Sequence, residues 1–236
     1  MASSLQDRTA FVTGASRGIG AAVARQLHAA GARVALASRS GDDLGLDGAL
    51  GVVCDVTDRE SVSAAVEATV GRFGGLDIVV ANAGVGAYGD FVDLAWDKVE
   101  AMIDVNLMGT LHTARATIPH LVADGGGDLL AVASVAGLRA FPGESVYNAS
   151  KFGQVGFIRS LDHELRDQGV RCTNICPGGV ATDFAMGDGR EPGMPELDGM
   201  MTPDEVAEVV LFALTRPRSV RILTTSFRPA GEGSWG

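Results

Sequence analysis

Tyr147 and Lys151 are the residues whose types and spacing are best suited to proton chemistry, since they lie four positions apart in the segment YNASK. On a helix this spacing places both side chains on one face. A free tyrosine has a pKa of about 10, and a neighbouring ammonium group favours the phenolate and lowers that pKa. Such a hydroxyl can give or take a proton near neutral pH, as an acid–base catalyst must. The spacing also occurs by chance on exposed helices, so the pair needs support from the rest of the chain.

The glycine-rich segment 14–20 (GASRGIG) lies between an apolar run at residues 9–13 and a helix-forming run at residues 21–30. This order predicts a strand, a glycine turn and a helix. Glycines let the backbone approach a pyrophosphate, and the helix N-terminus offers free N–H groups and the positive end of a dipole. The alternative is a tight turn that needs glycine only for positive φ. The flanking strand and helix favour nucleotide binding.

The end of the second predicted strand, residues 33–37, bears on the choice of dinucleotide. A carboxylate at this place binds the ribose hydroxyls of NAD, whereas an arginine accommodates the 2′-phosphate of NADP. Ser38 and Arg39 follow the strand without an acid, and Arg17 in the glycine segment can reach the same phosphate. These arginines favour NADP(H), the alternative being two solvated surface side chains.

Alternating strands and helices organise the remaining chain. Further strands are predicted by apolar runs at residues 51–54, 76–81, 129–133, 170–176 and 220–224. Helices are predicted at residues 58–72 (Asp58 as N-cap), 96–122, 145–168 and from 202 onward (Thr202 as N-cap, Pro203 first), with an abbreviated helix at 41–50. The alternation predicts one domain, residues 1–236, with an α/β, doubly wound parallel sheet of about seven strands.

Several polar or glycine residues follow the predicted strands directly. In sheets of this kind, ligands bind outside the carboxyl ends of the strands. One edge of the sheet is therefore expected to collect Gly14, Ser38, Asp55, Asn82, Ser134 and Pro177. Asn106 lies instead inside a predicted helix with apolar neighbours. A buried asparagine must satisfy its amide, so Asn106 either bonds a backbone group or marks a site.

Taken together, these motifs resemble those of the short-chain dehydrogenase/reductases. They occur in one order over about residues 8–182: TGASRGIG at 13–20, NAG at 82–84, Asn106, Ser134, Tyr147 with Lys151, and Pro177-Gly178. The resemblance implies a Rossmann-type fold and an NAD(P)-dependent oxidoreductase that acts on a carbonyl or alcohol group.

The resemblance also implies roles for individual residues. Tyr147 would be the catalytic acid/base and Ser134 would hold the substrate carbonyl. Lys151 would bind the nicotinamide ribose and lower the tyrosine pKa, and Asn106 would anchor a water in a proton relay. Asp55 would contact the adenine, Asn82 would support the cofactor site and Thr182 would touch the nicotinamide amide. The cofactor-binding residues expected in total are Gly14, Ser16, Arg17, Gly18, Ile19, Gly20, Ser38, Arg39, Asp55, Val56, Asn82, Ala83, Gly84, Tyr147, Lys151, Pro177, Gly178, Val180 and Thr182.

The chemistry of carbonyl reduction agrees with these roles. Hydride transfer to a carbonyl carbon builds negative charge on the oxygen, which needs a proton and a hydrogen-bond donor. Tyr147 and Ser134 supply them from a helix and the strand end before it. No metal is required for this reaction.

The leading function is therefore an NADP(H)-dependent reductase of a ketone, an aldehyde or a 3-oxoacyl group. One alternative is a dehydrogenase of small 3-hydroxy acids that works oxidatively, and another is a non-catalytic dinucleotide-binding sensor. The substrate pocket is expected from residues 85–95, 135–145 and 180–201, with the last as a lid. Its apolar lining is expected from Tyr88, Phe91, Leu138, Phe141, Phe184 and Met186.

Composition excludes several other classes of protein. The net charge of −10 and pI of about 4.8 argue against nucleic acid as a partner. The sequence contains no run of 18 apolar residues, so it predicts no membrane helix. The N-terminus lacks the apolar core of a signal peptide. The three cysteines have no metal-ligand spacing and are expected as reduced thiols, which predicts a cytoplasmic protein.

Two further expectations concern assembly. The apolar patterning of 96–122 and 145–168 exceeds what one sheet face should cover, and the resemblance places these helices at a shared interface. A homodimer or homotetramer is therefore expected. Many relatives end their last strand in Gly-Gly, whereas this chain continues through a tail at 226–236. That difference leaves the role of the tail open.

Overall fold

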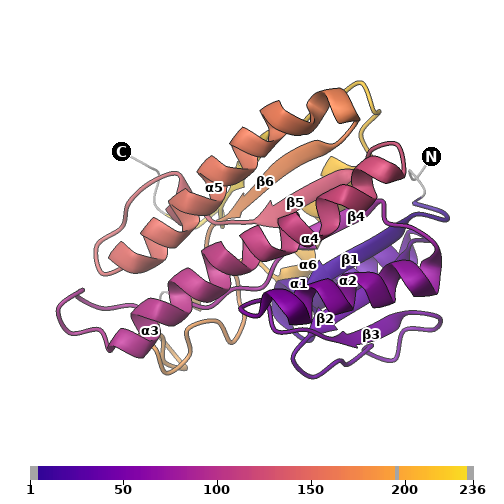
Figure 1. The fold of residues 1–236 in the computed structure, drawn as a ribbon. Helices are drawn as coiled ribbons and strands as arrows, with labels where there is room; N and C mark the ends of the chain where they lie inside the picture. The colour runs from indigo at the N-terminus through magenta and orange to yellow at the C-terminus, as the bar shows by residue number, and fades with distance from the viewer. Residues whose placement is uncertain (1–4, 195–196, 233–236) are drawn as a thin grey trace.

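Seven parallel strands form one sheet in the order β3-β2-β1-β4-β5-β6-β7 in the computed structural model, which describes residues 5–194 and 197–232 (Figure 1). The strands are β1 Thr9–Thr13, β2 Arg33–Ser38, β3 Leu50–Val53, β4 Ile78–Ala81, β5 Asp128–Val132, β6 Arg171–Pro177 and β7 Thr224–Phe227. The helices are α1 Gly18–Ala29, α2 Arg59–Phe73, α3 Trp96–Ala101, α4 Gly109–Ala123, α5 Ser145–Leu165 and α6 Pro203–Leu214, with short turns of other types at η1 Met102–Met108, η2 Val135–Gly137 and η3 Arg166–Gln168. The predicted doubly wound, single-domain fold is confirmed.

Strand β1 is the point at which the winding of the sheet reverses. It pairs with β2 on one side and with β4 on the other. The chain runs outward from β1 to β3, then crosses back to β4 and runs outward again to β7. Ligands of open α/β sheets bind at such a switch point, outside the carboxyl ends of the strands.

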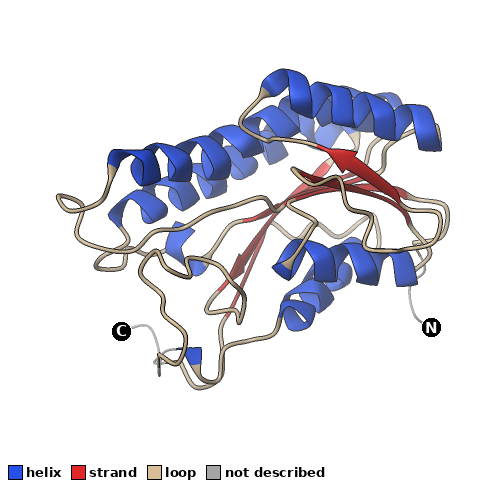
Figure 2. Ribbon diagram, turned by 90° about the horizontal axis from the view of Figure 1, so that it is seen from below, coloured by secondary structure: helices blue, strands red, loops and turns tan. Residues whose placement is uncertain are grey.

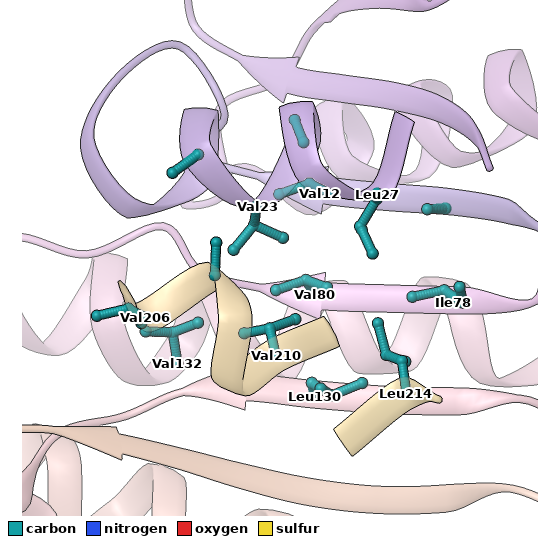
Figure 3. Close-up of a cluster of buried hydrophobic side chains, with 14 of the residues drawn as sticks. Val12, Val23, Leu27, Ile78, Val80, Leu130, Val132, Val206, Val210 and Leu214 are labelled. Atoms are coloured by element: carbon teal, nitrogen blue, oxygen red, sulfur yellow. The ribbon is translucent and has the colours of Figure 1, made fainter. Parts of the chain in front are cut away.

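Helices cover both faces of the sheet (Figure 2), which explains why the central strands are apolar without interruption. Helices α1 and α6 pack on one face, where Val23 of α1 and Val210 of α6 point toward Val12 and Val80 of the sheet (Figure 3). Helices α2, α4 and α5 pack on the other face, against Phe11 and its neighbours.

Two helix starts follow their sequence signals. The Asp58 side chain accepts a hydrogen bond from Glu60 N at 2.9 Å and caps α2. Thr202 and Glu205 form a reciprocal capping box at the start of α6, with Pro203 as its first residue. Both caps satisfy N–H groups that have no partner inside the helix.

The last strand lies further along the chain than predicted: β7 is Thr224–Phe227, not residues 220–224. The backbone carbonyls of Val220 and Ile222 accept hydrogen bonds from the side chains of Arg171 and Thr173. These bonds hold residues 220–223 outside the ladder, so regular pairing with β6 begins at Thr224.

The abbreviated helix expected at residues 41–50 is absent. Gly41, Leu44, Gly45 and Gly48 all have positive φ, between 58° and 72°. A right-handed helix needs negative φ throughout, so this connection between β2 and β3 forms turns instead.

The helix predicted at 96–122 runs without a break but changes type in its middle. Residues Met102–Met108 form a π-helix between α3 and α4, and Asn106 lies within it. Segments of this type are rare and are often found at functional sites. The amphipathic pattern predicted the helix and could not predict the wider turn.

Candidate active site

A cleft of about 1520 Å³ runs along the carboxyl ends of the strands. All six strand-end candidates line it, which confirms the expectation that one edge of the sheet collects them. Of the expected cofactor-binding residues, every one lines the cleft except Gly20, which is buried behind the glycine turn. Ser134, Tyr147 and Lys151 also line it, whereas Asn106 lies fully buried beside it.

The glycine turn after β1 packs closely against the end of β4. Gly14 has a φ of 64°, and a Cβ atom there would lie 2.8 Å from Ala83 Cα. The Asn82 amide donates to the carbonyls of Thr13 and Gly14 at 3.0 and 3.3 Å. Asn82 thereby holds the turn against the sheet in addition to lining the cleft.

The start of α1 is suited to a pyrophosphate group. Arg17 occupies the N-cap position, and no side chain accepts from the free N–H groups of the first turn. A helix N-terminus left in this way binds anions through those N–H groups and its dipole. The glycines leave room for the phosphates, so the residues present fit a dinucleotide.

The adenosine end of the cleft carries Ser38, Arg39, Asp55 and Val56. Hydrogen bonds from the backbone and side chain of Thr57 lower the pKa of Asp55 and fix its carboxylate. Arg17 and Arg39 are exposed, and neither forms an ion pair with a described residue. Both guanidinium groups are therefore available to an anion.

Tyr147 and Ser134 meet at the centre of the cleft. Tyr147 lies in the first turn of α5, and Ser134 follows β5 and caps the short turn η2, where it accepts from Ala136 N at 3.1 Å. Both side chains are more than nine-tenths buried. Burial raises the pKa of the Tyr147 phenol, and a hydrogen bond with Ser134 opposes that shift. Two hydroxyl groups thus converge where one substrate oxygen can contact both.

The expectation that Lys151 lowers the pKa of Tyr147 is wrong for this structure. The Lys151 Nζ lies 5.6 Å from the Tyr147 ring centroid and donates to Val132 O at 3.2 Å. Burial also lowers the pKa of Lys151 itself, to about 8. Loss of water destabilises the charged form of both groups, and it is the largest cause of both shifts.

Asn106 ties three parts of the site together. Its Oδ1 accepts from Val85 N at 2.8 Å, and its Nδ2 donates to Val85 O at 2.9 Å and to Ser150 Oγ at 3.0 Å. Ser150 in turn donates to the carbonyl of Tyr147. The Asn106 side chain therefore bonds backbone groups, which is the first of the two alternatives given by the sequence. The water-anchoring role stays a prediction.

The substrate end of the cleft is aromatic. The Tyr88 and Phe184 rings contact the Tyr147 ring at centroid distances of 6.0 and 5.6 Å. Of the six apolar residues expected here, Tyr88, Phe141 and Phe184 line the cleft. Phe91, Leu138 and Met186 do not; Phe91 is 51% exposed and contacts Trp96 instead.

Sequence reasoning did not single out several charged residues that line this cleft, among them Glu144, Arg190 and Glu232. Glu144 precedes Tyr147 by three positions, so helical spacing offered a signal for it. Arg190 and Glu232 arrive from the loop after β6 and from the C-terminal tail, for which no local pattern exists. Glu232 accepts from Gly179 N at 3.0 Å and from Arg228 Nε at 2.5 Å, so residues 228–232 pack against the cleft. The tail beyond residue 232 lies outside the described residues.

Metal-binding clusters and membrane-spanning helices are both absent from the part of the chain that the structure describes. Within residues 5–194 and 197–232, no group of three His, Cys, Asp or Glu side chains is arranged to hold a metal ion. In the same part of the chain, no helix has both the length and the apolar character to span a membrane. The three cysteines are buried and free.

Comparison with known proteins gives consistent results. A model of the short chain dehydrogenase family matches residues 8–192. An uncharacterised oxidoreductase of Staphylococcus aureus (strain N315) is 36% identical over 232 residues, covering 95% of this chain and 98% of the relative. The X-ray structure of an alcohol dehydrogenase from the archaeon Thermococcus sibiricus, complexed with 5-hydroxy-NADP, has a TM-score of 0.87 and 33% identity and covers 97% of this chain and 99% of that chain. The crystal structure of a 3-ketoacyl-(acyl-carrier-protein) reductase from Brucella melitensis, complexed with NADH, has a TM-score of 0.85 and 27% identity. This match covers 96% of this chain and 99% of that chain.

Proposed function

The chain belongs to the short chain dehydrogenase family of dinucleotide-dependent oxidoreductases, and from this we propose that it reduces a ketone, an aldehyde or a 3-oxoacyl group with NADP(H). The observation that carries the proposal is the buried contact of Tyr147 with Ser134 beside Lys151, at the edge of the sheet where the glycine turn can hold a dinucleotide. A non-catalytic sensor would not need Tyr147, Ser134 and Lys151 to converge on one point, so this arrangement favours an enzyme.

The side chains of the site divide the work between them. The bound nicotinamide supplies the hydride. Tyr147 gives its phenolic proton to the substrate oxygen as negative charge develops there, and Ser134 donates a hydrogen bond to the same oxygen. Lys151 is charged below about pH 8 and favours negative charge nearby. Asn106 fixes Val85 and, through Ser150, the backbone of Tyr147.

Burial raises the pKa of the Tyr147 phenol, so its hydroxyl carries a proton at neutral pH. A protonated phenol is the form that acts as the acid in carbonyl reduction.

Preference for NADP(H) rests on charge at the adenosine end. Arg17 and Arg39 line that end, and no acid follows β2. The Thermococcus sibiricus neighbour binds an NADP analogue and the Brucella melitensis neighbour binds NADH, so the fold accepts either cofactor. The two arginines support NADP(H) here. As in the family, Asp55 would contact the adenine and Thr182 would touch the nicotinamide amide.

The test is oxidation of NADPH, followed by absorbance, with a panel of ketones, aldehydes and 3-oxoacyl thioesters. Tyr147→Phe removes one oxygen, and since general acid–base catalysis contributes about 10²–10⁴-fold, turnover should fall by at least about 100-fold with NADPH affinity nearly unchanged. Tyr88→Phe is the matched control, because Tyr88 is the chain's other tyrosine and its ring touches Tyr147. The fall in turnover of the Tyr88→Phe variant should be far smaller than that of Tyr147→Phe. A folded Tyr147→Phe protein that keeps near-parent turnover would rule out the mechanism.

A further inference from the structure

Arg190 places a guanidinium group at the substrate end of the cleft. Its Cζ lies 5.5 Å from the Tyr88 ring centroid and 5.8 Å from that of Phe184. Both rings contact Tyr147, so a single aromatic layer separates the guanidinium from the proposed acid. Its charge is close enough to oppose the rise in the pKa of Tyr147.

The loop that carries Arg190 is held in place by specific contacts. Arg190 N donates to Ala185 O at 3.1 Å, and Gly187 N donates to Arg190 O at 2.8 Å, which closes a tight turn. Asp188 anchors this turn to the rest of the site, since its carbonyl accepts from Tyr88 N at 2.9 Å and its carboxylate pairs with Lys98 at 2.9 Å. The position of Arg190 is therefore set by the backbone around it.

Arg190 has no carboxylate within ion-pair distance among the described residues. Arg17 and Arg39 are likewise without an ion pair but lie at the adenosine end, and Arg228 is bonded to Glu232. Arg190 acts electrostatically on Glu144, whose pKa is raised by burial, but the two form no ion pair.

We propose that Arg190 binds a carboxylate of the substrate, so that the enzyme acts on oxo acids whose carbonyl lies at Tyr147. This inference rests on the proposed reductase function. The guanidinium donates from Nη1 to Phe184 O at 3.5 Å and is hydrogen-bonded to the Tyr88 hydroxyl. Its remaining N–H groups match a carboxylate in two parallel hydrogen bonds. Glu144 and Asp183 also line the cleft. Their negative charge opposes anions, so the site suits a singly charged carboxylate better than a phosphate dianion.

The experiment compares each oxo acid with its own methyl ester, so that charge is the main difference. The probes are 3-oxobutanoate, 4-oxopentanoate and 5-oxohexanoate with their methyl esters, each measured for kcat/KM with NADPH. The parent protein should prefer at least one acid over its ester by about 10-fold to 100-fold, as expected for charge-assisted hydrogen bonds. Arg190→Gln should bring that ratio to about 1 through KM, and Arg190→Lys should keep part of it.

Lys98→Gln is the matched control for the loop. It removes the ion pair with Asp188 but leaves the guanidinium, so it should affect acid and ester alike and keep their ratio. A parent protein that favours every ester, or an Arg190→Gln protein with an unchanged ratio, would overturn the inference while leaving the reductase function intact.

A direct binding measurement covers the remaining outcome, in which none of these probes is reduced. Calorimetry with the protein and NADP⁺ then reports whether the acids bind and whether Arg190→Gln abolishes binding. Binding lost in that variant supports the carboxylate site even without turnover. Absence of binding to the parent protein overturns the site, and failure of the whole carbonyl panel separately overturns the reductase function.

Discussion

Tyr147 and Lys151 are both removed from water by the packing of α5 against the sheet, and their pKa values move in opposite directions as a result. The pKa of the phenol rises and that of the ammonium falls to about 8. In each case burial penalises the charged form. The pair therefore stands at neutral pH as a protonated acid beside a cation that is close to losing its charge.

The first prediction is a pH dependence that follows from Lys151. Its pKa is lowered to about 8, so its charge is present below that pH and is lost as the pH rises through it. The kcat for reduction should fall as the pH rises from 7 to 9.5 and should show its midpoint near 8. Steady-state kinetics with saturating NADPH measures this profile. Lys151→Met should be slower and lack the step; a parent profile that stays flat to pH 9.5 contradicts the prediction.

A second residue-scale prediction concerns Arg17 and Arg39. Charge-assisted hydrogen bonds contribute about 1.5–3 kcal/mol each, so loss of both contacts should reduce the preference for NADPH over NADH by about 100-fold or more. Arg39→Asp combined with Arg17→Ala tests this through the ratio of the two dissociation constants. Arg25→Ala, on the first helix but outside the cleft lining, is the charge-matched control and should leave the ratio unchanged. An NADPH preference that survives in the double variant would refute the assignment.

At the scale of elements, the π-helix η1 is held to α5 by a polar seam. Thr110 Oγ1 donates to Asn106 O at 2.7 Å and accepts from Gln154 Nε2 at 2.6 Å. Thr113 on the next turn makes the same type of bond to Gly109 O, but no described side chain donates to it. Of these two threonines, therefore, only Thr110 links the backbone of Asn106 to a side chain of α5.

The third prediction compares Thr110→Val with Thr113→Val. Each variant loses one hydroxyl bond to a backbone carbonyl, but only Thr110→Val also leaves the Gln154 amide without its partner. An unpaired buried group costs about 1–3 kcal/mol, so Thr110→Val should lower the unfolding free energy by that much more than Thr113→Val. It should also lower kcat, because Asn106 loses a positioning contact. Urea unfolding and steady-state kinetics give the two readouts; equal effects in both variants would disprove the seam's role.

The loop at 180–201 is closed at its base and irregular beyond it. Ala181 N donates to Met201 O at 2.8 Å, and Met201 N donates to Gly179 O at 3.1 Å. Its described part contains no α-helix and pairs only through isolated bridges. Segments with few regular backbone hydrogen bonds open at low free energy, which suits a substrate lid.

The fourth prediction follows from that irregularity. Without ligand, amides of residues 183–194 and 197–200 should exchange with solvent much faster than those of β4 to β6. Adding NADP⁺ and a substrate analogue should slow their exchange, because a lid closes over bound substrate. Hydrogen exchange read by mass spectrometry tests both points. Protection equal to that of the sheet, unchanged by ligand, would exclude a lid.

At the scale of the whole molecule, α4 and α5 cover one face of the sheet and leave apolar side chains facing outward. Met108, at the end of η1, is 37% exposed and Phe152, on α5, is 45% exposed. Both lie beside the elements that the resemblance places at a shared interface.

The fifth prediction is a homodimer or homotetramer formed through this surface. Sedimentation at micromolar concentration should give a species of two or four chains, and Phe152→Asp should shift it toward the monomer by placing a charge in an apolar contact. Phe212→Asp on α6, an equally exposed phenylalanine on the other face, serves as the control. A single species of about 24.3 kDa for the parent protein would contradict the prediction.

Local sequence patterns predicted the alternation of strands and helices, the caps at Asp58 and Thr202, and the strand-end position of six cleft residues: Gly14, Ser38, Asp55, Asn82, Ser134 and Pro177. These features follow from apolar periodicity and local hydrogen bonding, which act over a few neighbouring residues. For the same reason, the glycine turn and the Tyr147 motif could be recognised without a fold.

Features that depend on residues far apart in the chain became visible only in the folded structure. The start of β7 was set by Arg171 and Thr173, and the pKa of Tyr147 by its burial rather than by Lys151. Arg190 and Glu232 reached the cleft through long connections. Desolvation and long-range contacts exist only once the chain has folded, and so no local pattern of residues can encode them.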